Sequence, residues 1–275
     1  SIRLKTTDSS GNDYEEVLSL SVNDLNETPR GIALQPHEDQ TNIKYLGDNF
    51  SVFAPMPYAV DIASDGTIWI VGYEGRISSG SFRRSGQTTF YTKDMVYEGM
   101  ETYVGLSDTT GNTVYNDVAV GDDGYVYIVG GTQREANPSW NGSDAFLWRI
   151  DSKVERDSNI YGSGVNKTWF GILETDLQDN STSSANAVGV DSDGSIYIAG
   201  NTENWLDGQI YSGSTDAYLS KFSSDGTNQW TRLLGSSSRD DASSLVIDSE
   251  GSIYISGTTQ GNIDGQISNG GSDAY

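Results

Sequence analysis

The side chains of this sequence that could do chemistry are mostly carboxylates. Its 275 residues include 39 Asp and Glu, against 16 Lys and Arg, one histidine and no cysteine. The acids recur as pairs ahead of a glycine, at Asp122/Asp123, Asp191/Asp193 and Asp248/Glu250. Two carboxylates roughly 5–10 Å apart can hydrolyse a glycoside, but such a pair should occur once in a chain. Because these pairs repeat, we interpret them as turn-forming residues.

Other catalytic chemistry has little support in the sequence. His37 lies between Pro36 and Glu38 in a segment without a strand pattern, so we interpret it as a surface residue. The chain has no cysteine nucleophile, no phosphate-binding glycine loop and no His-Glu-x-x-His zinc motif. We therefore expect a protein that is not an enzyme.

The net charge of −23 leaves two interpretations open. The acids could form a solvated surface that resists aggregation. Alternatively, some of them could bind Ca²⁺, which prefers oxygen ligands. Under either interpretation the charge argues against nucleic-acid partners, which need a basic face. No apolar run approaches the ~20 residues of a membrane span, so we expect no membrane insertion in this segment.

Trp140 and Trp205 are the candidate ligand-binding residues, because both lie in polar segments rich in Asn, Gly and Asp. Exposed aromatic rings on loops can bind sugars or protein partners. The alternative is a ring folded back over a sheet edge. The other tryptophans considered lie in strand patterns, where we expect them to pack between repeats. They are Trp69, Trp148, Trp169 and Trp230.

The elements that must position these residues come from an internal repeat. Ala185–Tyr218 recurs as Ala242–Tyr275, an offset of 57 residues with 18 of 34 positions identical. Each repeat contains a hairpin with an acidic turn that ends in a glycine, and we expect a positive φ there. The turn glycines are Gly66, Gly124, Gly194 and Gly251. A second glycine follows each hairpin, where we expect the chain to leave the sheet. These are Gly72, Gly130, Gly200 and Gly257.

Two further strands complete each repeat. We assign the third strands to Ser81–Ser85, Asp144–Ile150, Asp216–Phe222 and Asp273–Tyr275, and the fourth to Thr41–Gly47, Thr88–Thr92, Lys167–Leu173 and Asn228–Gly235. Four strands per unit predict an all-β fold, a β-propeller with about four blades present as part of a larger ring. The aspartates that open the third strands should hydrogen-bond to the adjacent loop, with Ca²⁺ between blades as the alternative. The insertions Tyr91–Tyr115 and Ile150–Lys167 could mark a binding face.

The repeat resembles the SBBP-type β-propeller repeats of bacteria. The resemblance rests on Gly213–Tyr218, Ser224–Gly226, Trp230–Gly235 and Val188–Gly200, and it covers about residues 41–275. It implies a propeller within a large secreted or surface-anchored protein, and it implies no catalytic residues.

Residues 1–30 resemble the C-terminal strands of a cadherin-like domain, an Ig-like β-sandwich. Thr6–Asp8 stands at the family's Ala-x-Asp position, and Val22–Pro29 resembles its linker motif. The resemblance implies Ca²⁺ ligands at Asp8, Asp24, Asn26 and Glu27. The motif departs from the family pattern at Glu27 and Thr28, which replace Asp and Asn, and it is one residue shorter before Pro29.

The sequence thus predicts three parts: the cadherin-like end at residues 1–30, a linker at 31–40 and propeller repeats at 41–275, with both ends resembling cuts in a longer polypeptide. We expect an extracellular or cell-surface adhesion or scaffold module that binds protein or carbohydrate and adjoins other modules of the same chain. Two alternatives remain. One is a hydrolase or lyase with a unique, inward-facing carboxylate pair of raised pKa, and the other is a purely structural spacer.

Overall fold

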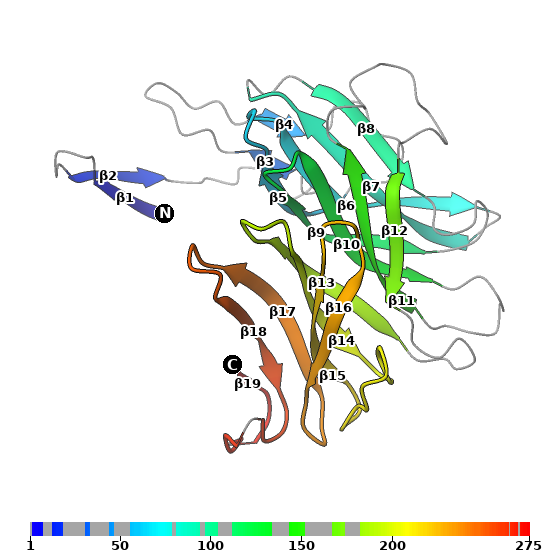
Figure 1. Ribbon diagram of the computed structural model, residues 1–275. Coiled ribbons are helices and arrows are strands. Elements are labelled where there is room, and N and C mark those ends of the chain that lie inside the picture. Colours follow the sequence, from blue (N-terminus) through cyan, green and yellow to red (C-terminus); the bar gives the residue numbers. More distant parts are fainter. Residues whose placement is uncertain are drawn as a thin grey trace. The chain divides into compact units, whose positions relative to one another are not determined.

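The computed structural model shows an all-β chain (Figure 1). The structure describes side chains in 56–75, 84–93, 112–133, 143–151, 182–263, 265–268 and 270–275, and the backbone alone in 2–7, 13–18, 31–33, 44–46, 76–78, 81–83, 97–103 and 167–173. These residues form strands and turns, so no helical membrane span occurs among them. By internal contacts the chain divides into Ser1–Arg30 and Gly31–Tyr275.

The first unit contains one hairpin, in which β1 (Ile2–Thr7) pairs antiparallel with β2 (Asp13–Leu18). The four Ca²⁺ ligands implied for this region all lie outside the described residues. In the second unit, β3 (Gly31–Ala33) pairs with β4 (Lys44–Leu46). The strand β3 therefore lies in the segment that we assign to the linker.

Four antiparallel sheets follow, each built from consecutive strands. The first sheet comprises β5 (Met56–Ile62), β6 (Ile68–Ser78), β7 (Ser81–Tyr91) and β8 (Tyr97–Tyr103). The second comprises β9 (Thr113–Val120), β10 (Tyr125–Gln133), β11 (Ser143–Asp151) and β12 (Lys167–Leu173). The third comprises β13 (Ser183–Val190), β14 (Ile196–Thr202), β15 (Asp216–Phe222) and β16 (Asn228–Leu234). The fourth comprises β17 (Asp240–Ile247), β18 (Ile253–Thr259) and β19 (Asp273–Ala274).

The first sheet differs from its prediction. The single strand β7 includes both segments that we assigned to a third and a fourth strand, and the actual fourth strand, β8, lies within the predicted insertion Tyr91–Tyr115. Gly86 lies in the middle of β7 and makes room for the next sheet, because a Cβ there would lie 2.2 Å from the ring of Tyr115.

The prediction for the second set of glycines is also wrong, since they lie inside the second strand of each sheet. Each stands opposite a β-bulge in the first strand. A Cβ on Gly130 would lie 1.9 Å from the carbonyl oxygen of Val114, and one on Gly257 equally close to that of Asp241. The bulge brings the neighbouring backbone so close that only glycine fits.

The sheets pack on one another in chain order, with the first strands β5, β9, β13 and β17 in successive contact (Figure 1). Trp69 and Trp148 are buried in the cluster between the first and second sheets, as predicted. Trp230 is half-buried, and the side chain of Trp169 lies outside the described part. Tyr127, Ile198 and neighbouring side chains fill the next junction. Consecutive sheets therefore bury apolar side chains against each other.

Candidate functional site

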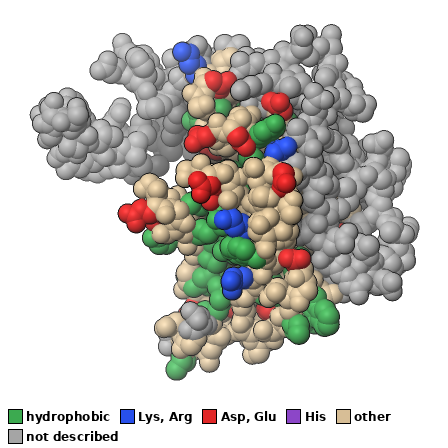
Figure 2. Space-filling model, viewed as in Figure 1, with side chains coloured by type: hydrophobic (Ala, Val, Ile, Leu, Met, Phe, Trp, Pro, Cys, Tyr) green, Lys and Arg blue, Asp and Glu red, His purple; other side chains and the backbone are tan. Residues whose placement is uncertain are grey.

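The recurrent acidic pairs form turns, as predicted. Asp191 accepts the backbone N–H groups of Asp193 and Ser195 through Oδ1, at 2.9 and 2.8 Å. Asp248 does the same in the fourth sheet. The four turn glycines have φ angles between 78° and 85°. On the face drawn in Figure 2 the carboxylates are spread among other side chains and do not form a single patch.

One carboxylate pair does not follow the repeat. Asp61 in β5 and Asp117 in β9 stand at positions that other sheets fill with small or apolar residues. Asp61 accepts the N–H of Val120 at 2.7 Å, and Asp117 accepts that of Val188 at 2.8 Å, each across a junction between sheets. Burial raises the pKa of the Asp117 carboxyl, and the nearby charge of Asp61 adds to that rise.

The remaining oxygen of each carboxylate also has a partner. Oδ1 of Asp61 accepts the N–H of Ile62 at 2.8 Å, and Oδ1 of Asp117 accepts that of Val118 at 2.9 Å. Each side chain therefore joins its own strand to the next sheet through two backbone amides. Such bonds favour a structural role for both carboxylates. Acid–base catalysis, however, also uses a carboxyl group of raised pKa that lies beside a second carboxylate.

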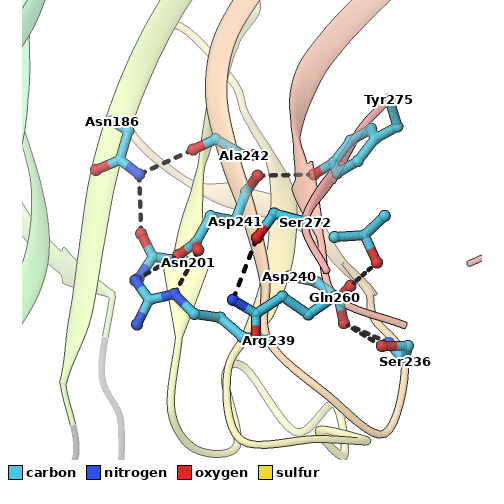
Figure 3. Close-up of polar contacts among 11 residues, drawn as sticks. Asn186, Asn201, Ser236, Arg239, Asp240, Asp241, Ala242, Gln260, Ser272 and Tyr275 are labelled. Carbon is cyan, nitrogen blue, oxygen red and sulfur yellow. Dashed lines mark hydrogen bonds and ion pairs between the residues drawn. The ribbon is translucent and has the colours of Figure 1, made fainter. Parts of the chain in front are cut away.

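Asparagines at the bulges add a second set of links between sheets. Asn116 in β9 donates to the carbonyl oxygen of Ala185 at 2.9 Å. Asn186 in β13 donates to that of Ala242 and to Oδ1 of Asn201, both at 2.8 Å (Figure 3). These amides satisfy backbone groups that the bulges leave out of the ladder.

The aspartates that open the third strands bond to the adjacent loop, as predicted. Asp216 accepts the N–H groups of Ser212 and Gly213, at 2.6 and 3.2 Å. In the fourth sheet Asp273 accepts the hydroxyl of Ser268 at 2.7 Å. These bonds close the long connection between the second and third strands.

At the junction of the third and fourth sheets, Asp216 meets a second buried carboxylate, Asp240. Both side chains are fully buried. Asp240 accepts the N–H and the hydroxyl of Ser236, at 2.6 and 2.8 Å, and the hydroxyl of Thr259 (Figure 3). Burial, with the charge of Asp240 as a smaller cause, raises the pKa of Asp216. Within the described ranges no group of three or more His, Cys, Asp or Glu is placed to hold a metal ion.

Three exposed apolar side chains lie on the connection between β14 and β15, and we refer to them together as the platform. They are Trp205, Ile210 and Tyr211, of which Trp205 is 56% exposed and Ile210 71%. Leu206 is buried and anchors a tight turn, since it bridges to Gln209. The buried anchor therefore leaves its neighbour Trp205 at the surface.

The aromatic members of this platform are absent from the fourth sheet. There the positions of Trp205 and Tyr211 are taken by Asn262 and Ser268. Sequence analysis selected Trp205 and missed Tyr211, although the replacement of Tyr by Ser between two otherwise similar repeats was a usable signal. The second candidate, Trp140, lies outside the described residues.

Comparison with known proteins supports an SBBP-type β-propeller repeat. Residues 229–264, from β16 to the turn after β18, match the SBBP β-propeller repeat family. The regulatory protein FlaEY of Caulobacter vibrioides is 28% identical over 174 residues, which are 56% of this chain and 17% of that protein. The chain thus spans a small part of the length of this relative.

Two solved structures align with part of this chain. A protein of unknown function from Dyadobacter fermentans aligns with a TM-score of 0.47 at 12% identity, over 75% of this chain and 57% of the other. The polysaccharide lyase Uly1 aligns with a TM-score of 0.46 at 15% identity, over 80% and 48%.

Proposed function

We propose that the chain is a non-enzymatic adhesion or scaffold module that binds carbohydrate on the platform of Trp205, Ile210 and Tyr211. The observation that carries the proposal is the exposure of all three side chains on a loop whose neighbouring apolar residue, Leu206, is buried. Exposed aromatic surface beside polar groups is where proteins commonly bind ligands.

The surroundings of the platform suit a sugar. Asn204 and Asp207 lie close to Trp205 in the sequence. Asn204 accepts the backbone N–H of Trp205 at 2.7 Å, and Asp207 accepts a hydrogen bond from Asn228 at 3.0 Å. A pyranose ring can place its C–H groups on Trp205 while amide and carboxylate groups bond to its hydroxyls. Because the chain carries a net charge of −23, we expect neutral or basic glycans rather than anionic ones.

We also propose how this segment is placed within a longer protein. We take each sheet to be one blade of a larger propeller ring, located at a cell surface or outside the cell. Residues 1–30 then form the end of a cadherin-like module, in which Asp8, Asp24, Asn26 and Glu27 bind Ca²⁺ and stiffen the junction.

Affinity electrophoresis in gels that contain neutral polysaccharides tests the carbohydrate proposal. We expect retarded migration of the wild type and at least tenfold weaker binding of Trp205→Ala. Ile267→Ala is the matched control, because it truncates the residue equivalent to Ile210 in the fourth sheet, where the aromatic partners are absent. Equal binding by Trp205→Ala would contradict the platform. Binding to proteins but to no glycan would show that the ligand is a protein and not a carbohydrate. The absence of any binding would favour a purely structural spacer.

A second candidate function is that of a hydrolase or lyase that uses Asp61 and Asp117. The observation in its favour is that neither acid recurs at the equivalent position of another sheet and that the pKa of Asp117 is raised. If it is correct, the protein releases new reducing ends from a polysaccharide, and Asp117→Asn abolishes that release while the fold persists. Against it stand the four backbone N–H groups that already bond to the two carboxylates.

A further inference from the structure

The platform is carried by a tight hairpin within the connection between β14 and β15, which is yellow in Figure 1. The N–H of Gln209 donates to the carbonyl oxygen of Leu206 at 2.9 Å, and the reverse bond measures 3.3 Å. The two residues at the tip, Asp207 and Gly208, have φ angles of 50° and 74°. A type I′ turn requires positive φ at both tip residues, and Asp-Gly is one of its preferred dipeptides. The dipeptide therefore accounts for the hairpin.

This hairpin has an inner and an outer side. Leu206 is buried and packs in the cluster between the second and third sheets. Trp205 and Ile210 are the next residues on the two arms, and side chains alternate between the two sides of a strand. They therefore lie on the outer side, in agreement with their exposure. Asp207, at the tip, is separated from each of them by only one or two residues.

The turn alone does not explain why its first tip residue carries a charge, because Asn-Gly forms the same turn as Asp-Gly. Asp207 is exposed, and its Oδ2 accepts a hydrogen bond from Nδ2 of Asn228 at 3.0 Å. Nδ2 of Asn228 also donates to Oγ1 of Thr231 at 3.3 Å, so the amide is fixed in one orientation. In the described part of the chain, Oδ1 of Asp207 has no hydrogen-bond partner. This oxygen is open to a ligand.

The surroundings of the Asp207 carboxylate are negatively charged. No ion pair joins it to a lysine or arginine of the described residues. The connection from Glu203 to Thr215 contains two acids and no basic residue. The net charge of −23 adds to the negative potential at this point. A positively charged group of a ligand would therefore be stabilised here, whereas a neutral group would not.

We propose that the platform selects glycans that carry free amino groups, such as chains of glucosamine. This inference rests on the proposed carbohydrate function and narrows it to basic sugars. The pyranose ring lies with its C–H groups on Trp205, and its protonated amine donates to Oδ1 of Asp207. An acetylated amine is neutral and keeps the ring contact only. The charge of Asp207 thus determines specificity, while Trp205 supplies the contact that both sugars share.

Calorimetric titration with a hexamer of glucosamine and a hexamer of N-acetylglucosamine tests this specificity, at a mildly acidic pH that protonates the sugar amine. The wild type should bind the glucosamine hexamer about fivefold more tightly, which is the upper range for one exposed charge pair. This preference should disappear in 1 M NaCl, where the Debye length is about 3 Å. Asp207→Asn should also remove the preference, because Asn keeps the turn and lacks the charge.

Asp264→Asn is the matched control. It removes the same charge from the equivalent Asp-Gly dipeptide of the fourth sheet, where Asn262 and Ser268 replace the two aromatic residues. It should prefer the glucosamine hexamer as strongly as the wild type does. A lost preference in Asp264→Asn would show that the overall charge of the protein attracts the amine, and it would overturn the inference.

The inference and the proposed function fail in different ways. If Trp205→Ala weakens binding of both hexamers while Asp207→Asn keeps the preference, the carbohydrate site stands and its specificity for amines is wrong. A wild type that binds the two hexamers equally, or binds neither, also overturns the inference. If Trp205→Ala binds both hexamers as tightly as the wild type, the platform is not the binding site and the proposed function fails as well.

Discussion

Asp240 illustrates how one residue changes the chemistry of a repeated junction. The equivalent residues are Thr113, which shares a hydrogen bond with Thr132 at 2.9 Å, and Ser183, which accepts the N–H of Ala145 at 2.8 Å. A carboxylate at this position is buried close to that of Asp216. Two buried acids that repel each other favour a protonated form. The junction of the third and fourth sheets should therefore respond to pH.

We expect Asp240→Ser to stabilise the protein at neutral pH. The pKa of Asp216 is raised in the folded state, so the folded protein holds its proton more tightly than the unfolded chain does. That contribution to stability is present in acid and is lost as the pH rises through the folded pKa. Removal of the Asp240 charge should lower this pKa and raise the free energy of unfolding by about 1 kcal/mol at pH 7.

Urea unfolding between pH 4 and 8 measures this effect. Asp241→Ser is the control, because it removes a charge that is paired with Arg239 outside the buried pair. A variant Asp240→Ser that is less stable than the wild type at pH 7 and equally dependent on pH would contradict the prediction.

Sequence analysis identified those acids whose role is local. Asp191 and Asp248 cap turns within a few residues of themselves, so their spacing from a glycine was enough to predict their role in the turn. The role of Asp240 depends on Asp216, which is distant in sequence and close only after two sheets pack. No pattern along the chain carries that information.

Among the elements, the bulged first strands and their facing glycines determine how closely strands approach. Gly130 and Gly131 are adjacent in β10 and differ sharply in their surroundings. A Cβ on Gly130 would lie 1.9 Å from a backbone oxygen, whereas one on Gly131 meets nothing closer than 3.7 Å. The first clash can be relieved only by movement of the backbone.

We therefore expect Gly130→Ala to lower the free energy of unfolding by about 3 kcal/mol, the upper range for overpacking. Gly131→Ala should change it by less than about 1 kcal/mol. Equilibrium unfolding in urea compares the two variants. Equal effects would show that the bulge opposite Gly130 does not constrain the strand as the structure indicates.

The hairpins could be predicted because acidic turns and alternating strands are visible in a single repeat. The bulges could not, since they arise from the pairing of two strands. The first sheet was misassigned because the segments matched to a third and a fourth strand of the other repeats belong to one long strand, β7. Whether two short strand patterns continue into each other depends on strand pairing, which the sequence alone does not show.

For the whole molecule, the role of calcium stays a prediction. We expect millimolar Ca²⁺ to raise the melting temperature relative to EDTA, and Asp24→Ala to abolish the rise. A ligand at a hundred times its Kd stabilises the folded state by about 2.7 kcal/mol. Differential scanning calorimetry measures the shift. A rise that survives the substitution would place the ion elsewhere, and no rise would leave the acids as turn formers and solubilising charge.

The order of the sheets along the chain has a consequence for biogenesis. Each sheet is built from one continuous stretch, and the contacts between sheets join consecutive sheets. A polypeptide with this connectivity can fold from its N-terminal end while the remainder is still being synthesised or exported. Each newly emerged stretch finds its docking partner already assembled, so little of the chain has to wait for a distant segment.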